Sequence, residues 1–239
     1  MKFFPLTLPS PEENLACDEA LLEAVEQGEC EEVLRVWNAL SYFVVAGYSN
    51  RVETEVNVPF CRSQGVPILR RCTGGGTVLQ GPGCLNYSLI LRIEDSAPLA
   101  GITRTNEYIM DRNRAALMTV LGSDLRVQGH TDLTRNGLKF SGNAQKRKLK
   151  ALLFHGTFLL GLDPGMVERT LRMPSKEPGY RASRSHGDFI LNLEVPASQV
   201  EGALVREWEA HEALTEFPTE TISRLVREKY ARDDWNFKF

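Results

Sequence analysis

The segment VPILRRCTGGGTVLQGPGCLNYSLILRI, residues 66–93, carries the strongest local signals in the chain. Apolar and β-branched residues fill its two ends, 66–71 and 86–93, and this composition predicts two strands. The glycine- and proline-bearing connection 72–85 lies between them. We therefore expect a loop whose ends are fixed by two strands, which is a common setting for functional residues.

Three consecutive glycines, Gly74, Gly75 and Gly76, form the centre of this connection. Without Cβ atoms, the chain can bring its backbone N–H groups close to a phosphate or carboxylate, and Arg70 and Arg71 can add positive charge. The spacing matches neither GxxxxGK[ST] nor a GxGxxG that opens a helix, so the two common nucleotide-binding motifs are absent. Taken alone, such a run is more often a flexible hairpin than an anion site.

The rest of the chain predicts an α+β fold, with mixed, mostly antiparallel β-sheets flanked by helices. Ser10, Pro11 and Glu13 form a capping-box pattern that begins a helix ending near Gly28. Further strands are expected at 33–38 and 42–47, which we expect to pair, and at 125–127, 138–142 and 151–162. Helices are expected at 103–121, 164–171, 200–214 and 219–230. Gly156, inside the last strand, marks a bulge or a close backbone approach.

Bulk properties narrow the class of protein. The 239 residues are expected to form one domain, 1–239, and to be monomeric. A net charge of −3 gives no basic field, so nucleic acid is not an expected partner. No apolar run approaches the roughly 18 to 20 residues of a membrane span, and prolines interrupt the N-terminal apolar stretch. The five cysteines include no CxxC pair, which indicates reduced cytoplasmic thiols without structural zinc.

Two further segments carry residues with chemical potential. Lys139 begins a short strand that continues into Ser141 and Gly142, where an inward ammonium would face a carboxyl or phosphoryl group. A lone lysine is usually solvated. His155 lies beside Gly156 in an apolar strand, where it either reaches a ligand or is a hydrogen-bonded core histidine.

These segments occur in a characteristic order: RRCTGGGTV, LNYSLIL, LKFSGNAQ and HGTFLL. In this order they resemble the catalytic domain of lipoate-protein ligases, within the biotin and lipoate ligase and octanoyltransferase superfamily. The resemblance extends to 14–22, 36–50, 55–57, 181–193 and 233–237, and so covers nearly the whole chain. Agreement at so many ordered sites is more specific than any one motif.

The resemblance implies an enzyme that joins lipoate, or octanoate, to a lysine of a carrier domain in two steps. ATP, with Mg²⁺, would first activate the acid as an acyl-adenylate. The lysine of an apo lipoyl-carrier domain, of the 2-oxoacid dehydrogenase E2 or glycine-cleavage H type, would then take the acyl group and release AMP. Such a reaction needs charge neutralisation, alignment of two anions and exclusion of water.

The resemblance also implies roles for individual residues. Lys139 would be catalytic and contact the acyl carboxyl and phosphate oxygens. Lys146 would contact phosphate, and Asp132 would hold Mg²⁺. The substrate or acyl-adenylate would be bound by Trp37, Arg70, Thr73, Gly74, Gly75, Gly76, Val78, Asn86, Ser141, Gly142, Ala144, His155 and Thr157.

Three departures from the family pattern qualify this assignment. Gln80 stands where many ligases have histidine, and Lys146 stands where an arginine is common, which loses a bidentate phosphate contact. The chain stops soon after DDWNF, residues 233–237, so we expect no C-terminal accessory domain. Adenylation would then require a separate accessory protein or proceed unaided.

The main alternative is an octanoyl or lipoyl transferase that uses a cysteine thioester and no ATP. Such an enzyme needs a nucleophilic thiolate. The segment 129–138 and the chain after His155 contain no cysteine, and we expect Cys72 and Cys84 to be packing residues. A biotin ligase would carry arginines within its glycine loop, and a non-catalytic binding module would have no need of Lys139.

Overall fold

The computed structural model describes residues 1–93 and 98–239. Its strands are β1 (Lys2–Phe4), β2 (Val33–Asn38), β3 (Phe43–Ala46), β4 (Ile68–Arg70), β5 (Val78–Gln80), β6 (Cys84–Arg92), β7 (Leu125–Gln128), β8 (Asp132–Arg135), β9 (Leu138–Arg147), β10 (Ala151–Leu159) and β11 (Glu212–Ala213). Its helices are α1 (Pro11–Gln27), α2 (Val52–Glu55), α3 (Val58–Ser63), α4 (Ile102–Leu121), α5 (Pro164–Thr170), α6 (His186–Phe189), α7 (Ala197–Glu207), α8 (Thr219–Leu225) and α9 (Asp233–Asn236), with a 3-10 turn η1 (Gly179–Arg181) and a π-helical turn η2 (Val226–Tyr230).

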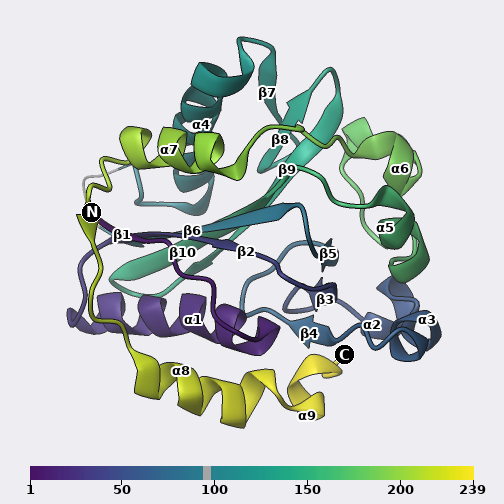
Figure 1. The fold of residues 1–239 in the computed structure, drawn as a ribbon, viewed down its shortest axis with the longest axis horizontal. Helices are drawn as coiled ribbons and strands as arrows, with labels where there is room; N and C mark the ends of the chain where they lie inside the picture. The colour runs from purple at the N-terminus through teal and green to yellow at the C-terminus, as the bar shows by residue number, and fades with distance from the viewer. Residues whose placement is uncertain (94–97) are drawn as a thin grey trace.

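These strands form an eight-stranded and a three-stranded sheet, which confirms the predicted α+β fold (Figure 1). The large sheet runs β11-β1-β2-β6-β10-β9-β8-β7, and the small sheet runs β4-β3-β5. Strand β1 pairs in parallel with β2 and β11, and β3 pairs in parallel with β4. The remaining neighbours are antiparallel, as expected for mixed, mostly antiparallel sheets.

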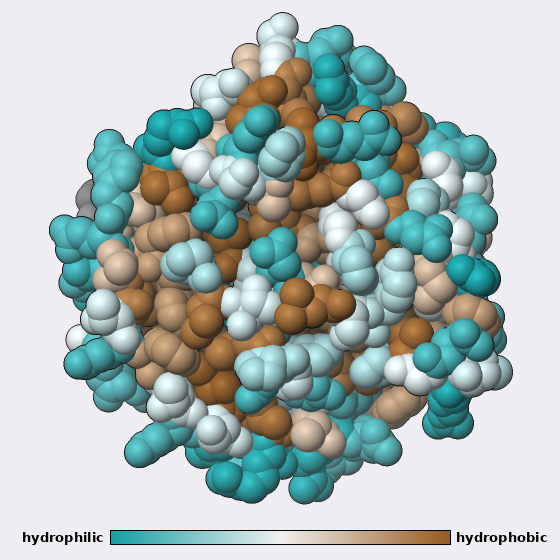
Figure 2. All heavy atoms as spheres, viewed as in Figure 1, coloured by the Kyte–Doolittle hydropathy of each residue, from teal (hydrophilic) through white to brown (hydrophobic). Residues whose placement is uncertain are grey.

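The large sheet separates two hydrophobic cores. On one face α4 and α7 pack against each other, and on the other face α1 lies between the sheet and α8 (Figure 1). The neighbouring residues Val33 and Leu34 belong to different cores, because successive side chains of a strand point to opposite faces. In the space-filling view, hydrophilic residues cover the rim and apolar residues show mainly in the middle (Figure 2). Within the two described ranges, no helix has the length and apolar character needed to cross a bilayer.

Helix α1 begins and ends as its sequence predicts. The Ser10 hydroxyl accepts a hydrogen bond from the Glu13 amide at 3.1 Å, and the Glu13 carboxylate accepts one from the Ser10 amide at 2.9 Å. Gly28 ends the helix in the left-handed conformation, at φ 79°. Since α1 is covered on both sides, it also buries charged residues, including Asp18 and Glu19.

Two predictions about strands were wrong. The segments 33–38 and 42–47 form strands, but they do not pair: β2 lies between β1 and β6, whereas β3 belongs to the small sheet. Residues 39–42 carry the chain from one sheet to the other. The connection 72–85 is also not one long loop, because it contains β5 and the first residues of β6.

The predicted end of the helix at 200–214 was also wrong. Helix α7 stops at Glu207, and the Trp208 that follows is buried and donates its indole N–H to Asn113 of α4 at 2.8 Å. Glu209 then takes a positive φ of 51°, which turns the chain toward β1. Residues 212–213 pair there as β11.

Candidate active site

The side chains of the site lie in two cross-strand rows on the face of the large sheet that carries α1 and the small sheet. The histidine row pairs Arg35, Ser88, His155 and Ala144 across β2, β6, β10 and β9. The tryptophan row, two residues along each strand, pairs Trp37, Asn86, Thr157 and Gly142. Neighbouring strands are about 4.8 Å apart, so each row extends over roughly 14 Å.

Lys139 reaches this face through an irregularity in β9. Its partner β8 pairs Leu133 with Ser141 but Thr134 with Lys139, so β9 carries one extra residue, Phe140. Such a β-bulge changes the face to which the following side chains point. Phe140 is buried in the core beneath α4, whereas the Lys139 ammonium lies over Gly142, 2.7 Å from where a Cβ atom of residue 142 would be.

Asp132 fixes the position of the Lys139 ammonium. The Lys139 Nζ lies 2.8 Å from Asp132 Oδ1, and the Tyr180 hydroxyl donates to Asp132 Oδ2 at 2.7 Å. Burial and the nearby Asp132 charge raise the pKa of Tyr180, so its hydroxyl stays a donor. The Lys139 side chain keeps 26% of its surface exposed, so a ligand can reach the ammonium.

Asp132 supplies only one carboxylate for a metal ion, and both of its oxygens have partners. Among the described residues, no group of three or more His, Cys, Asp or Glu side chains is placed to hold a metal. Mg²⁺ is commonly bound by one or two carboxylates together with substrate phosphates. A Mg²⁺ ion at Asp132 would therefore need substrate phosphate oxygens and water molecules as its other ligands.

The glycine loop connects β4 to β5 and lies next to the β9 end of the histidine row. Gly75 has a φ of 87°, and its carbonyl passes so close to Gly47 that a Cβ at residue 47 would collide with it. On its other side, Gly75 approaches Ala144. Gly74, Gly75 and Gly76 are exposed, and within the described chain no hydrogen bond uses their backbone N–H groups. These amides are free to bind an anion.

The two arginines that precede the loop shape the backbone instead of facing solvent. Arg71 is buried and donates to the Thr73 hydroxyl and to the carbonyls of Gly74 and Gly76, at 2.6 to 3.1 Å. Burial lowers the pKa of Arg71 to about 10, so the guanidinium remains charged at neutral pH.

Arg70 is fully buried, and its guanidinium donates to the backbone carbonyls of Gly47, Tyr48, Asn50, Trp235 and Asn236. The resemblance implies a ligand contact for Arg70, but here the guanidinium ties α9 to the small sheet. The exposed loop amides and the partly exposed Lys139 ammonium are accessible from solvent.

Thr73, His155 and Asp18 form a hydrogen-bonded chain from the loop into the protein. His155 Nε2 lies 2.7 Å from the Thr73 hydroxyl, and His155 Nδ1 lies 3.1 Å from Asp18 Oδ2. An ionised Asp18 only accepts, so His155 Nδ1 carries a proton and donates to it. This series of hydrogen bonds holds the glycine loop against β10.

Asp18 is kept ionised although it is completely buried. Burial alone would raise the pKa of Asp18, but the Arg35 guanidinium at 2.6 Å, together with His155 and Ser88, lowers it below its ordinary value. Arg35 is itself fully buried and also donates to the carbonyl and amide oxygens of Asn14. This acid and its partners therefore form a charged centre beneath the site.

Lys146 lies on the same face as Ala144, and its ammonium is paired. Its Nζ is 2.9 Å from Glu19, which also binds Lys229 at 2.6 Å and accepts from the Tyr230 hydroxyl at 2.8 Å. Burial would raise the pKa of Glu19, but the two lysines lower it. Lys146, the residue expected to contact phosphate, is thus held by Glu19, and Glu19 in turn links it to η2.

The remaining predicted residues lie at or near the tryptophan row, with one exception. Thr157 donates to Asn86 at 2.6 Å and accepts from Gln80 at 2.7 Å, so a side chain of the small sheet reaches the large sheet. Val78 begins β5 and is partly buried beside it. Ser141 faces the other way: it is buried and lies 3.4 Å from Asn143, which bonds to Tyr87 of the opposite core.

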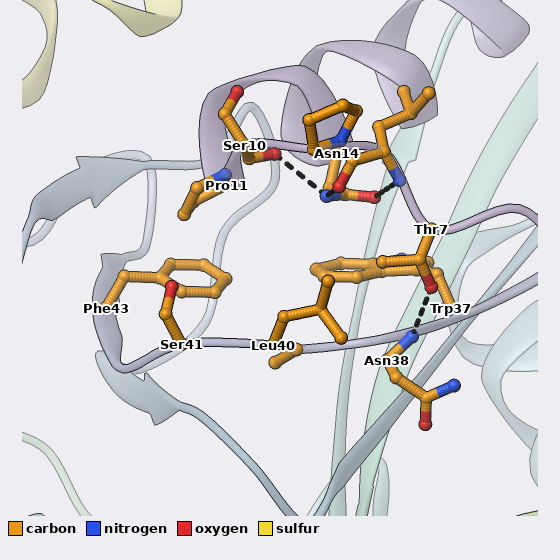
Figure 3. A pocket seen from close by; sticks show the side chains of 12 residues that line it. Thr7, Ser10, Pro11, Asn14, Trp37, Asn38, Leu40, Ser41 and Phe43 are labelled. Atoms are coloured by element: carbon orange, nitrogen blue, oxygen red, sulfur yellow. Dashed lines mark hydrogen bonds between the residues drawn. The ribbon is translucent and has the colours of Figure 1, made fainter.

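Trp37 closes the outer end of the tryptophan row. One side of its ring lines a surface cavity of about 10 Å³, and Figure 3 shows Trp37 and Phe43 flanking this cavity with Leu40 below them. A larger cavity, of about 310 Å³, lies away from both rows, between β4 and the C-terminal segment. It holds none of the predicted site residues.

Four buried polar residues of the site were not predicted: Asp18, Glu19, Arg35 and Ser88. Arg35 and Ser88 interrupt otherwise apolar strands, VLRVWN and NYSLIL, whereas Asp18 and Glu19 lie in the more polar sequence of α1. A charged residue within a buried strand is unusual unless it has a partner, so the opposite charges of Asp18 and Arg35 were the available signal. The close backbone approach predicted at Gly156 is confirmed, because the Asn143 amide occupies the space of a Cβ there.

Comparisons with known proteins identify relatives of this chain. A putative lipoate-protein ligase A of Aeropyrum pernix is 31% identical over 209 residues, covering 87% of this chain and 74% of the relative. Lipoate-protein ligase A subunit 1 of Thermoplasma acidophilum is 26% identical over 245 residues, covering 93% and 90%. Octanoyltransferase LipM of Moorella thermoacetica is 28% identical over 257 residues, covering 94% and 93%.

Solved structures have the same fold. A lipoate-protein ligase A bound with ATP superimposes with a TM-score of 0.84 at 25% identity, covering 99% of this chain and 98% of that one. A structure from the bi-partite lipoate protein ligase system of Thermoplasma acidophilum gives 0.83 at 25% identity, covering 99% and 95%. The family model of the lipoyl protein ligase A/B catalytic domain matches residues 10–205. The predicted resemblance is confirmed, and the chain belongs to the lipoyl protein ligase A/B catalytic domain family.

Proposed function

We propose that this chain is an ATP-dependent lipoate-protein ligase that forms an acyl-adenylate and transfers the acyl group to a carrier lysine. The observation that carries the proposal is the position of Lys139 on the same sheet face as the free amides of Gly74, Gly75 and Gly76. An oriented ammonium beside several unpaired N–H groups suits a carboxylate and a phosphate that must be brought together.

The cysteines support the ligase over the thioester-dependent transferase. Cys17, Cys61, Cys72 and Cys84 are buried, and burial raises the pKa of Cys17, Cys72 and Cys84 to about 12. Cys72 lies beside the loop, but a thiol with that pKa is protonated at neutral pH and is a poor nucleophile. Burial also raises the pKa of the partly exposed Cys30.

In the first step, the acid's carboxylate oxygen attacks the α-phosphorus of ATP, and the bond to pyrophosphate breaks. Lys139 would reduce the repulsion between the two anions, and the loop amides would bind the phosphate. Asp132 orients Lys139 and is the residue that would hold Mg²⁺, which would neutralise charge on the phosphates. In the second step, the carrier amine attacks the acyl carbon and loses a proton, while the bond to AMP breaks.

The acceptor would be a lysine of an apo lipoyl-carrier domain. This part of the proposal follows the Thermoplasma acidophilum study, which describes a bi-partite lipoate protein ligase and its E2 lipoyl domain. The relative named subunit 1 belongs to the same organism. We therefore include a separate accessory subunit as a partner in the adenylation step.

The test is to incubate the purified protein with ATP, Mg²⁺, lipoate and an apo lipoyl domain, with and without an accessory subunit. Pyrophosphate release and the mass of the carrier are followed together. The ligase proposal predicts stoichiometric pyrophosphate and a lipoylated carrier. Acyl transfer from an octanoylated carrier without ATP, abolished by a cysteine substitution, would instead establish the transferase.

Lys139→Ala should reduce both half-reactions by at least about 100-fold, because the charge that faces both anions is removed. Since the side chain is partly exposed, the unfolding free energy should change by less than about 1 kcal/mol. Lys150→Ala, at an exposed turn, is the matched control and should leave the rates unchanged. Normal adenylate formation by Lys139→Ala would refute the assigned role.

A further inference from the structure

A third cross-strand row lies on the opposite face of the large sheet, the face that carries α4 and α7 (Figure 1). Tyr87 of β6, Gly156 of β10 and Asn143 of β9 are direct partners across these three strands. Since Gly156 has no side chain, the Tyr87 hydroxyl passes over it and donates to Asn143 Oδ1 at 2.6 Å. The Asn143 amide fills the space that a Cβ atom of residue 156 would take. The glycine thus lets two strands that are not neighbours share a side-chain hydrogen bond.

This hydrogen bond is the middle of a longer series, which we call the Tyr87 network. On one side, Asn113 of α4 donates to the Tyr87 hydroxyl at 2.7 Å and accepts from the Trp208 indole N–H at 2.8 Å. On the other side, Asn143 Nδ2 donates to the Thr131 carbonyl at 2.6 Å. The network therefore connects the residue after α7 with the residue before β8.

The two ends of the Tyr87 network fix the direction of every hydrogen bond in it. An indole N–H only donates, so the oxygen of Asn113 faces Trp208 and its nitrogen faces Tyr87. A backbone carbonyl only accepts, so the nitrogen of Asn143 faces Thr131 and its oxygen accepts from Tyr87. The single proton of the Tyr87 hydroxyl satisfies both amides. Neither amide can reverse without losing its hydrogen bonds, so the network has one arrangement.

Burial makes this arrangement rigid. Tyr87, Asn113 and Trp208 are 1%, 0% and 4% exposed, so water cannot replace a partner that is lost. Leaving a buried polar group without a hydrogen bond is unfavourable. Burial also raises the pKa of Tyr87, so its hydroxyl remains a donor.

The Tyr87 network ends one residue from the candidate site. Thr131 directly precedes Asp132, whose carboxylate holds the Lys139 ammonium at 2.8 Å. The ladder between β8 and β9 reaches only to Leu133, so Asp132 lies beyond it. Asn143 continues the connection to β9, because its side chain donates to the Thr131 carbonyl and its own carbonyl accepts from the Thr131 hydroxyl at 2.8 Å. Asn143 thus fixes the place where β8 begins.

We propose that Asn143 and Tyr87 are positioning residues that set the place of Asp132 and, through it, of the Lys139 ammonium. They act from the face of the sheet opposite the candidate site. This assignment rests on the ligase function proposed above, in which Lys139 must be aligned with two anions. A displaced ammonium still attracts the substrates but no longer lies where charge develops in the reaction, so kcat falls more than binding.

The first experiment measures ATP-dependent pyrophosphate release with lipoate by the intact protein. Asn143→Ala should lower kcat about tenfold and change KM for lipoate and ATP by less than about threefold. Tyr87→Phe keeps the bond from Asn143 to Thr131 and the stacking of the ring on Phe158, so kcat should fall less, by about threefold. Circular dichroism confirms that each variant is folded. Wild-type kcat in both variants, or a change in KM alone, would overturn the proposal.

Tyr108→Phe is the matched control, because it removes a tyrosine hydroxyl on the same side of the sheet. That hydroxyl accepts from Arg112 of α4 at 2.9 Å, outside the Tyr87 network, and the Tyr108 ring packs against the same core as Tyr87. The control should keep the wild-type kcat. If it loses as much kcat as Tyr87→Phe, the network has no particular effect on Lys139 and the proposal is wrong.

The reactivity of Lys139 tests its position without turnover. Acetic anhydride modifies free amines, and mass spectrometry gives the rate at Lys139 relative to the exposed Lys150 of the same sample. Asn143→Ala should raise this ratio about threefold, because Asp132 no longer holds the amine in a partly exposed ion pair. Tyr108→Phe should not change it.

The two measurements separate this inference from the proposed function. If the wild-type protein releases no pyrophosphate but the Lys139 ratio rises in Asn143→Ala, the ligase function fails and the positioning assignment stands. If pyrophosphate is released but neither kcat nor the ratio changes in Asn143→Ala, the ligase function stands and the positioning assignment is wrong.

Discussion

Asp18 shows how one buried acid organises several residues of the site. Its two carboxylate oxygens accept from Arg35, Ser88 and His155, and His155 in turn contacts Thr73 of the glycine loop. A buried charge is tolerated because its partners satisfy it. Asp18 therefore acts on the loop through His155, as a positioning residue.

Asp18→Asn should destabilise the protein by about 3 kcal/mol, because it leaves the Arg35 guanidinium buried without an opposite charge. Ser88→Ala removes one neutral donor to the same carboxylate and should cost about 1 kcal/mol. Urea unfolding monitored by circular dichroism measures both. If the two variants lose the same stability, the charge pair with Arg35 is not the main contribution of Asp18.

At the scale of elements, the bulge in β9 decides which side chain reaches the face of the candidate site. In a regularly alternating strand with the same sequence but no bulge, Phe140 would share the face of Gly142 and Ala144, and Lys139 would point into the opposite core. Gly142 then provides the space in which the ammonium lies. The bulge and this glycine together present Lys139 to the glycine loop.

Gly142→Ala should therefore lower kcat/KM for adenylation by about 10- to 100-fold, because the new methyl group displaces the Lys139 ammonium. The displaced group is the flexible end of a side chain, so the unfolding free energy should change by less than about 1 kcal/mol. Gly161→Ala, where no atom lies within 4 Å of the added Cβ, is the control and should keep full activity. Full activity in Gly142→Ala would contradict the assigned position of Lys139.

At the scale of the whole molecule, buried charges join segments that are distant in the sequence. Glu19 of α1 binds Lys146 of β9 and Lys229 and Tyr230 of η2, so the C-terminal segment is fixed to the site. Arg70 connects α9 to the small sheet in a similar way. The glycine loop is therefore supported from both ends of the chain.

These buried acids predict a stability that depends on pH. The folded-state pKa values of Asp18 and Glu19 lie below their ordinary values of 3.8 and 4.5, so folding favours the charged forms. Their contribution is complete above the ordinary values and is lost as the pH falls through the folded-state values. Unfolding free energies measured from pH 7 to 3 should fall below about pH 4.5.

Glu19→Gln and Asp18→Asn provide the control for this pH dependence. Each variant should have a lower unfolding free energy at pH 7 and lose less of it on acidification. The reason is that each lacks one carboxyl group whose protonation is coupled to unfolding. An unchanged slope in both variants would show that other carboxylates carry the acid sensitivity.

The sequence alone determined the locally encoded parts of this protein. Near neighbours in the sequence determine the capping box at Ser10 and Glu13, the ends of α1 and the alternation of side chains along the strands. The ordered motifs identified the family. The resemblance assigned a ligand contact to Arg70, which stays a prediction, and only the structure shows that its guanidinium binds backbone carbonyls distant in sequence. Proximity in the sequence also predicted a pairing of β2 with β3, because adjacent strands in a sequence are usually neighbours in a sheet.

Only the tertiary structure decided which side chains meet at the site. The face to which Lys139 points depends on a register shift between β8 and β9, and the hydrogen bond of Gln80 to Thr157 depends on a contact between two sheets. A one-residue change in register reverses every side chain of a strand, and sequence spacing does not fix that register. Local patterns therefore specified the helices and strands, and long-range packing specified which side chains lie close enough to interact.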